Sequence, residues 1–139
     1  MGCFYCDKDQ PLYDLMIEVC KLSTSTVYLF REQTYRGRCN VVFNRHEGNL
    51  FALGDDELSC FFLDVAKTAK AINKVFSPGK INYGAFGDKM PHLHVHVVPK
   101  YEGEAGWGGT FEMNPQKIYL SDDEYDRMIK DIKNNIENE

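Results

Sequence analysis

Two kinds of spacing recur among the hydrophobic positions of this chain. Apolar residues three or four positions apart are typical of one face of a helix, and runs rich in β-branched and aromatic residues are typical of strands. The helical spacing predicts helices at 11–21, at 55–76 and after Ser121. The strand-like runs predict strands at 25–32, 38–46, 80–86 and 92–100. Together these elements predict an α+β domain, with an antiparallel sheet and helices packed against it.

The predicted helices begin with recognisable local signals. Pro11 suits the first turn of a helix, because that turn does not use the N–H that proline lacks. Asp55 and Asp56 place negative charge at the start of the second helix, where the helix dipole favours it. Ser121 and Glu124 have the spacing of a capping box before the last helix.

Length and charge fit one globular domain that does not bind polymeric nucleic acid. We expect a single domain over residues 1–139, because neither a linker nor an internal repeat interrupts the pattern. The formal net charge is −5, and the segment 121–139 contributes most of it. The sequence has no basic patch of the kind that DNA or RNA requires. A small phosphorylated ligand stays compatible with this composition, since a pocket can be locally positive in an acidic protein.

Cysteine usage and hydropathy predict where the protein works. Neither a secretion signal nor an apolar run long enough to span a membrane is apparent in the sequence, so we expect no membrane partner. The five cysteines are an odd number and lack the spacing of a disulfide scaffold. We therefore expect a cytoplasmic protein with reduced cysteines.

Three of the four histidines stand at every second position of the stretch MPHLHVHVVPKY, residues 90–101. Because side chains alternate between the faces of a strand, His92, His94 and His96 are expected to share one face. The apolar residues between them are then expected to point into the core. One imidazole of such a row can attack phosphorus, while a neighbour binds the phosphate oxygens. The alternative is a surface strand whose histidines have no function, and strict alternation makes this the weaker interpretation.

The run HLHVHVV matches the alternating signature of the histidine triad (HIT) family, and other stretches resemble the same family. RGRCNVVFNRH resembles its second core strand, LGDDELSCFFLDVAKTAKAI its central helix, and INYGAFGDKMPHLHVHVVPKY its strand, loop and triad. The resemblance covers a core of about residues 3–101 and leaves 102–139 as a C-terminal loop and helix. It implies a HIT-like antiparallel sheet of about five strands.

The same resemblance implies an enzyme that acts on nucleotides and is usually a homodimer. Its substrate would be a purine nucleotide or dinucleotide, cleaved at the α-phosphate of a phosphoramidate or a dinucleoside polyphosphate. His94 would be the catalytic nucleophile and would form a covalent nucleotidyl intermediate. His96 would hydrogen-bond the phosphate oxygens or the leaving group. The residues do not choose between a phosphoramidase and a dinucleoside polyphosphate hydrolase.

A second candidate site begins with the stretch CFYC, in which Cys3 and Cys6 form a Cys-x-x-Cys pair. Two thiolates at this spacing can bind one zinc ion, although a redox dithiol and a pair of bystander thiols are alternatives. Zinc-bearing HIT proteins add a histidine after the second core strand and the first triad histidine. The resemblance therefore implies a structural zinc site made of Cys3, Cys6, His46 and His92.

Residues near the triad are candidates for binding the substrate. Asn82 stands where the family often uses an asparagine to hold phosphate, although it can equally serve a turn. Asp88 replaces a common glutamine and puts the usual phosphate contacts in doubt, because an acid repels phosphate. Lys89 could compensate, or be a solvated loop lysine. Leu29, Phe30 and Arg31 match the family's base and ribose pocket. Trp107 in a glycine-rich loop is expected either to cap a pocket or to pack at a dimer interface.

Two rival functions are compatible with the same residues. The first is a nucleotide-binding or scaffold protein with little turnover, which would bind nucleotide without releasing a product. The second is a histidine-rich metal-handling protein, which would carry exchangeable metal on His94 and His96.

Overall fold

A computed structural model describes residues 2–113, 115 and 117–138 of the chain. The elements found in these residues are α1 (Phe4–Asp7), α2 (Gln10–Leu15), β1 (Met16–Lys21), β2 (Ser25–Phe30), β3 (Cys39–Phe43), the 3-10 helix η1 (Leu50–Ala52), α3 (Asp55–Phe76), β4 (Lys80–Gly84), β5 (His94–Lys100) and α4 (Asp122–Glu137). The segment 102–113 contains no helix or strand. Of the positions that the predictions covered, Met1, Asn114, Gln116 and Glu139 lie outside the described residues.

The strands of this part of the chain form one sheet in the order β1-β2-β3-β5-β4. Each strand pairs with its neighbours in antiparallel orientation. β5 lies inside the sheet, so that His96 faces Asn40 of β3 on one side and Gly84 of β4 on the other. The predicted α+β architecture with five antiparallel strands is confirmed.

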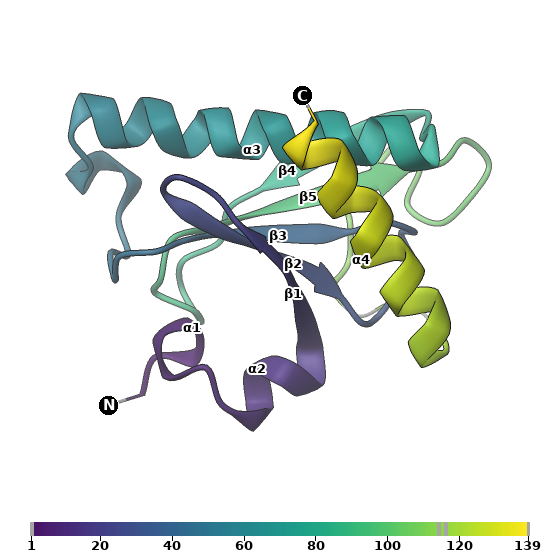
Figure 1. The fold of residues 1–139 in the computed structure, drawn as a ribbon, viewed down its shortest axis with the longest axis horizontal. Helices are drawn as coiled ribbons and strands as arrows, with labels where there is room; N and C mark the ends of the chain where they lie inside the picture. Colours follow the sequence, from purple (N-terminus) through teal and green to yellow (C-terminus); the bar gives the residue numbers. More distant parts are fainter. Residues whose placement is uncertain (1, 114, 116, 139) are drawn as a thin grey trace.

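The two faces of the sheet are covered by different parts of the chain. Val41, Val95 and Val97 belong to the core on one face, where α3 runs across the sheet and α4 packs beside it (Figure 1). The other face carries Tyr28, Phe30 and Val42, which pack against residues of α1 and α2 on the side away from α3 (Figure 1). Because Val95 and Val97 enter the first core, His94 and His96, which alternate with them along β5, belong to the second face.

The predicted helix at 11–21 is wrong beyond Leu15. There α2 ends and the chain enters β1. The register between β1 and β2 shifts between Glu18 and Cys20, which marks a β-bulge. The bulge leaves both Val19 and Cys20 buried, so the strand loses its period of two. The apolar positions of α2 and β1 together then imitate helical spacing, which explains the error.

Other element predictions differ from the structure only at their ends. The helix predicted at 55–76 is α3, and the capping box of Ser121 and Glu124 is present at the start of α4. Each of the four predicted strands is shorter in the structure than in the prediction, at one end or at both. β5 begins at His94, and His92 lies in a bend just before it.

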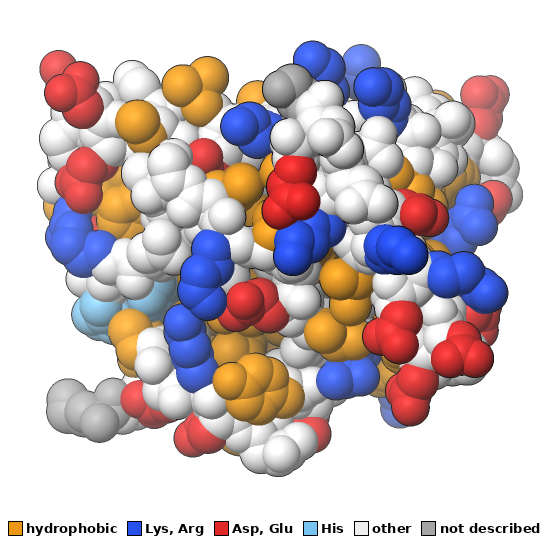
Figure 2. Space-filling model, in the orientation of Figure 1, with side chains coloured by type: hydrophobic (Ala, Val, Ile, Leu, Met, Phe, Trp, Pro, Cys, Tyr) orange, Lys and Arg blue, Asp and Glu red, His pale blue; other side chains and the backbone are white. Residues whose placement is uncertain are grey.

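Charged side chains of both signs are spread over the surface of the molecule (Figure 2). On the face shown in Figure 2, Lys and Arg side chains are interspersed with those of Asp and Glu. The first turn of α4 holds Asp122, Asp123 and Glu124, where the helix dipole favours acids. Within the described residues, none of the helices is long and apolar enough to span a bilayer.

Candidate active site and metal centre

Four side chains with nitrogen and sulfur donors meet beside the end of β3. They are those of Cys3, Cys6, His46 and His92, and one donor atom from each lies within 4.8 Å of the others. The Sγ of Cys3 caps α1 by accepting from the backbone N–H of Cys6 at 3.3 Å, so this short helix brings the two thiols together. The structure thus places all four predicted metal ligands in one cluster.

His92 turns a lone pair toward this cluster. Its Nε2 lies 2.6 Å from the carbonyl oxygen of Phe43 and must carry the proton, since a carbonyl only accepts. Its Nδ1 is therefore free to bind a metal, and it lies 3.4 Å from the Sγ of Cys3 and 3.4 Å from that of Cys6. Burial lowers the pKa of His92, which favours this neutral form.

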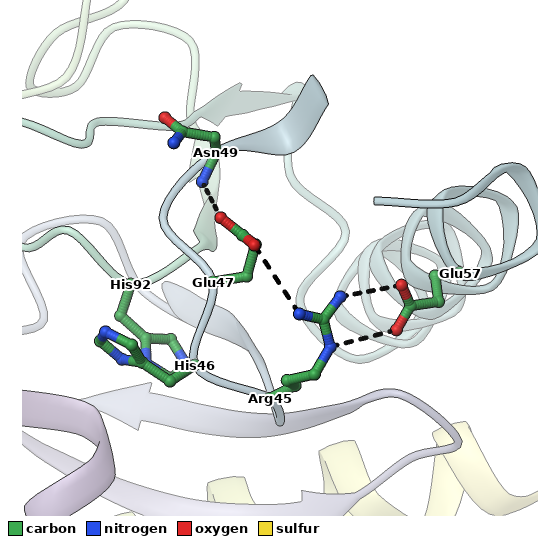
Figure 3. A network of polar contacts seen from close by, with 6 residues as sticks. All are labelled: Arg45, His46, Glu47, Asn49, Glu57 and His92. Carbon is green, nitrogen blue, oxygen red and sulfur yellow. Dashed lines mark hydrogen bonds and ion pairs between the residues drawn. The ribbon is translucent and has the colours of Figure 1, made fainter. Parts of the chain in front are cut away.

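His46 is held in position by the ion pairs of its neighbour. Arg45 binds the carboxylate of Glu57 on α3 through contacts of 2.9 and 3.4 Å, and it lies 3.7 Å from the carboxylate of Glu47 (Figure 3). These contacts tie the segment after β3 to the first turn of α3. They leave the imidazole of His46 beside that of His92, with 3.2 Å between the two Nδ1 atoms (Figure 3).

The spacing of the four donors fits a tetrahedral metal ion. Zinc bonds of about 2.3 Å to sulfur and about 2.0 Å to nitrogen place tetrahedral donors roughly 3.3–3.8 Å apart. The contacts that involve the histidine nitrogens measure 3.2–3.4 Å. Two thiols and two imidazoles complete a four-coordinate set, which is typical of a closed structural site. The cluster can therefore hold a metal ion.

His94 presents the nitrogen lone pair that a nucleophile needs. Its Nδ1 lies 2.7 Å from the carbonyl oxygen of His92, which makes Nδ1 the protonated nitrogen and leaves the lone pair on Nε2. Burial lowers the pKa of His94, although this hydrogen bond acts in the opposite direction. At neutral pH the ring is therefore a neutral imidazole, the form that can attack phosphorus.

His96 lies in an aromatic enclosure and is only 1% exposed. Its ring stacks on Phe30 with 5.5 Å between centroids, and the rings of Phe86 and Phe111 lie 5.9 and 5.7 Å away. Gly84 makes room for this packing, because a Cβ atom there would lie 2.7 Å from the ring of Phe111. Burial, followed by the charge of a nearby arginine, lowers the pKa of His96 to about 3.

Tyr5 covers His94, although no sequence pattern singled it out. Its ring centroid lies 5.1 Å from that of His94, and its hydroxyl accepts a hydrogen bond of 2.7 Å from Nδ2 of Asn40. Tyr5 stands between the two cysteines of CFYC. The two cysteines of the metal cluster and the cover of the candidate nucleophile therefore belong to the same short helix and its N-cap. An aromatic residue between two predicted ligands was the only available signal.

Arg38 was also missed, because a lone arginine at the start of a strand normally lies in solvent. Instead its side chain is fully buried beneath the histidine face. Its Nη2 lies 3.3 Å from Nδ1 of His96, and its guanidinium lies 4.3 Å from the centroid of Phe30. A cation thus stands next to the third histidine of the triad.

Of the three predicted base-pocket residues, Phe30 is the one that contacts the triad. Leu29 points from the opposite face of β2 into the core beneath α3. Arg31 follows the strand, and its Nε donates to the carbonyl oxygen of Tyr13 at 2.6 Å. A role in base recognition stays a prediction, and the geometry concentrates it on Phe30.

Asn82 lies farther along the sheet than the triad. It pairs with Val98, two positions beyond the pairing of Gly84 with His96, and it lines a hollow with Lys100 and Trp107. The ring of Trp107 packs on Gly79 of the same chain, where a Cβ atom would lie 2.9 Å from it. A role for Asn82 in phosphate binding stays a prediction.

Asp88 and Lys89 are exposed in the segment before β5. Lys89 lines a hollow of about 220 Å³ that also borders the metal cluster. A second hollow, of about 180 Å³, reaches His94 between Phe86 and Leu50. Substrate roles for Asp88 and Lys89 stay predictions, and the second hollow is the one that reaches the candidate nucleophile.

The HIT domain family model matches residues 18–103. An uncharacterized HIT-like protein of Methanocaldococcus jannaschii is 32% identical over 73 residues, which are 50% of this chain and 57% of the relative. The asymmetrical bis(5′-nucleosyl)-tetraphosphatase of Schizosaccharomyces pombe is 33% identical over 89 residues, 60% of this chain and 48% of the relative. The chain thus spans about half the length of these two relatives. An adenosine 5′-monophosphoramidase of the same yeast is 24% identical over 141 residues, 94% of this chain and 100% of the relative.

Solved structures share the fold. A histidine triad protein from Bradyrhizobium japonicum has a TM-score of 0.83 at 20% identity, with 92% of this chain and 96% of that chain covered. A Zn-bound histidine triad family protein from Mycobacterium smegmatis has a TM-score of 0.68 at 16% identity, with 99% and 95% covered. The family model matches most of the sheet and α3, and the solved structures show the same fold. The chain therefore belongs to the HIT domain family.

Proposed function

We propose that this protein is a hydrolase that cleaves nucleotides at the α-phosphate through a covalent nucleotidyl-His94 intermediate. The observation that carries the proposal is the 2.7 Å hydrogen bond from Nδ1 of His94 to the carbonyl oxygen of His92. It fixes the tautomer and leaves the Nε2 lone pair available for attack. Relatives named as a phosphoramidase and as a dinucleoside tetraphosphatase support this reaction class.

The proposed reaction proceeds in two displacements at phosphorus. In the first, the lone pair of His94 Nε2 forms a bond to the α-phosphorus, and the leaving group departs with the electron pair of its bond and takes up a proton from the solvent. In the second, a water molecule attacks the same phosphorus, the bond to Nε2 breaks and its electron pair returns to the imidazole. The water gives up a proton to the solvent. One water is consumed, and the products are the nucleoside monophosphate and the protonated leaving group.

The proposed substrate is a purine nucleoside phosphoramidate or a dinucleoside polyphosphate. Incubation of the native protein with adenosine 5′-phosphoramidate and, separately, with diadenosine tetraphosphate tests both classes by the release of AMP. We expect AMP from at least one of them. Binding of AMP without turnover of either substrate would contradict the proposal and support a nucleotide-binding or scaffold protein.

The cluster of Cys3, Cys6, His46 and His92 is proposed to bind zinc as a structural ion. With all four positions taken by protein ligands, the ion would hold α1 against the ends of β3 and β5 and would not activate water. Because Tyr5 lies between the two cysteines, its place over His94 would depend on this tie. A cytoplasmic location and a homodimer remain predictions, and sedimentation equilibrium would test the second.

Purification without chelator or affinity metal should give about one equivalent of zinc per chain by elemental analysis. Cys6→Ser should lose most of it, because the cluster would keep only three of its ligands. Cys60→Ser is the matched control, since this half-buried thiol on α3 lies outside the cluster and its loss should not change the zinc content. Less than a tenth of an equivalent in a folded native protein would refute the zinc site.

A further inference from the structure

Arg38 is a buried cation without an ion pair among the described residues. Its Nη1 donates to the carbonyl oxygens of Glu112 and Met113 at 2.9 and 3.2 Å. Its guanidinium packs against the rings of Phe30 and Phe111, at 4.3 and 5.1 Å from their centroids. Burial lowers the pKa of Arg38 to about 10, so the side chain keeps its charge at neutral pH. Burying a charge without an ion pair is costly, so the charge of Arg38 calls for an explanation beyond packing.

The contact between Arg38 and His96 determines where the proton of His96 lies. A guanidinium has only donors, so Nη2 of Arg38 must donate to Nδ1 of His96 across their 3.3 Å separation. The lone pair of His96 is then on Nδ1, and its proton is on Nε2. In a doubly protonated His96, the N–H at Nδ1 would face a donor of Arg38. The positive charge of Arg38 also disfavours this second proton.

The proton that this arrangement places on Nε2 has no acceptor. Nε2 of His96 is buried and lacks a hydrogen-bond partner within the described part of the chain. The Nε of Arg38 and the Oδ1 of Asn40, the cross-strand neighbour of His96, are unpartnered in the same way. Buried polar groups are normally satisfied, and an anionic oxygen is the kind of acceptor that would satisfy a free donor beside an unneutralised cation.

We propose that Arg38 is a positioning residue of the active site: it keeps the proton of His96 on Nε2, which then donates to a phosphate oxygen of the substrate. The inference rests on the proposed function of the histidine face. His96 then acts as a fixed donor and not as a base, and its orientation is set before the substrate arrives. Such preorganised donors are most effective where water is excluded, as it is around this ring.

The test compares the native protein with Arg38→Met, Arg38→Lys and Arg36→Met. Methionine keeps most of the buried volume without a donor, and lysine keeps a cation that can donate. Arg36 is the matched control, because it is exposed and lies two residues away. Long-range ¹H–¹⁵N spectra, with the His96 signals assigned through His96→Gln, show which ring nitrogen carries the proton. The values of kcat and KM are measured with whichever of adenosine 5′-phosphoramidate and diadenosine tetraphosphate the native protein cleaves faster.

The native spectrum should show His96 with its proton on Nε2 alone. Arg38→Met should shift part or all of the population to the other tautomer and lower kcat about 100-fold, with a smaller change in KM. Arg38→Lys should recover part of both effects, and Arg36→Met should match the native protein. A native His96 protonated on Nδ1 would overturn the inference without any variant, even if Arg38→Met failed to fold. An unchanged tautomer or an unchanged kcat in folded Arg38→Met would also overturn it.

Failure of the proposed function gives a different pattern. The native protein would then release no AMP from either substrate, while the spectra would still show whether Arg38 sets the tautomer of His96. Turnover by the native protein together with an unshifted His96 in Arg38→Met would instead leave the hydrolase proposal intact and reject the role of Arg38.

Discussion

His94→Asn is expected to lower the release of AMP from adenosine 5′-phosphoramidate by at least about 10³-fold, because it removes the nucleophile itself. An amide nitrogen has no lone pair available for attack on phosphorus. The asparagine NH₂ can still donate to the carbonyl oxygen of His92, so the start of β5 should keep its structure. AMP release is followed by chromatography under saturating substrate.

Binding and stability measurements show whether the loss of turnover comes from the missing nucleophile and not from lost binding or folding. His94→Asn should bind AMP within a few-fold of the native affinity, because asparagine keeps a polar group at this position. Its unfolding midpoint should stay close to that of the native protein. Turnover within ten-fold of the native rate would show that another group attacks phosphorus.

Phe61→Ala is expected to lower the free energy of unfolding by about 3–5 kcal/mol, because it opens a cavity between α3 and the sheet. Phe61 is fully buried, and its ring meets that of Phe43 edge-on with 5.4 Å between centroids. The loss combines the burial of the ring with this aromatic contact. Urea unfolding followed by circular dichroism gives the change in free energy.

The next residue along α3 provides the control. Phe62 is 43% exposed, so Phe62→Ala should change the free energy of unfolding by less than about 1 kcal/mol. Equal losses from the two substitutions would mean that the face of α3 assigned to the core is wrong.

Hydrophobic periodicity predicted those helices and strands in which one pattern runs without interruption. The apolar stripe of 55–76 predicted the bounds of α3, because a long amphipathic helix repeats its signal many times. The alternation in β5 correctly predicted that Val95 and Val97 face the core and that the histidines between them face away. The four predicted metal ligands also lie together in the structure. Their combination came from the family resemblance, because spacing alone does not relate the two cysteines to the two histidines.

Interactions between distant segments account for what the sequence did not predict. The β-bulge of β1 depends on pairing with β2. It gave the apolar residues of this strand a helix-like spacing, so the sequence predicted a helix there. Leu29 and Phe30 were both predicted to line the base pocket. As adjacent residues of a strand, however, they lie on opposite faces of the sheet. Arg38 is buried because the segment around Glu112 supplies acceptors for it, and no local pattern reports such a contact.

The N-terminal part of the site lies outside the stretch that defines the family. The family match begins at residue 18, whereas Tyr5 and the two cysteines of the cluster precede it. Tyr5 nevertheless lies against His94, and Cys3 and Cys6 lie against His92.

The central claim is a covalent nucleotidyl group on His94, and the most direct measurement is its detection during turnover. The native protein is mixed with adenosine 5′-phosphoramidate, quenched at alkaline pH, where a histidine N–P bond persists, and analysed by mass spectrometry before and after digestion. We expect the mass of one adenylyl group on the peptide that contains His94, and none in His94→Asn. An adenylyl group on another residue, or release of AMP by His94→Asn at the native rate, would contradict the account.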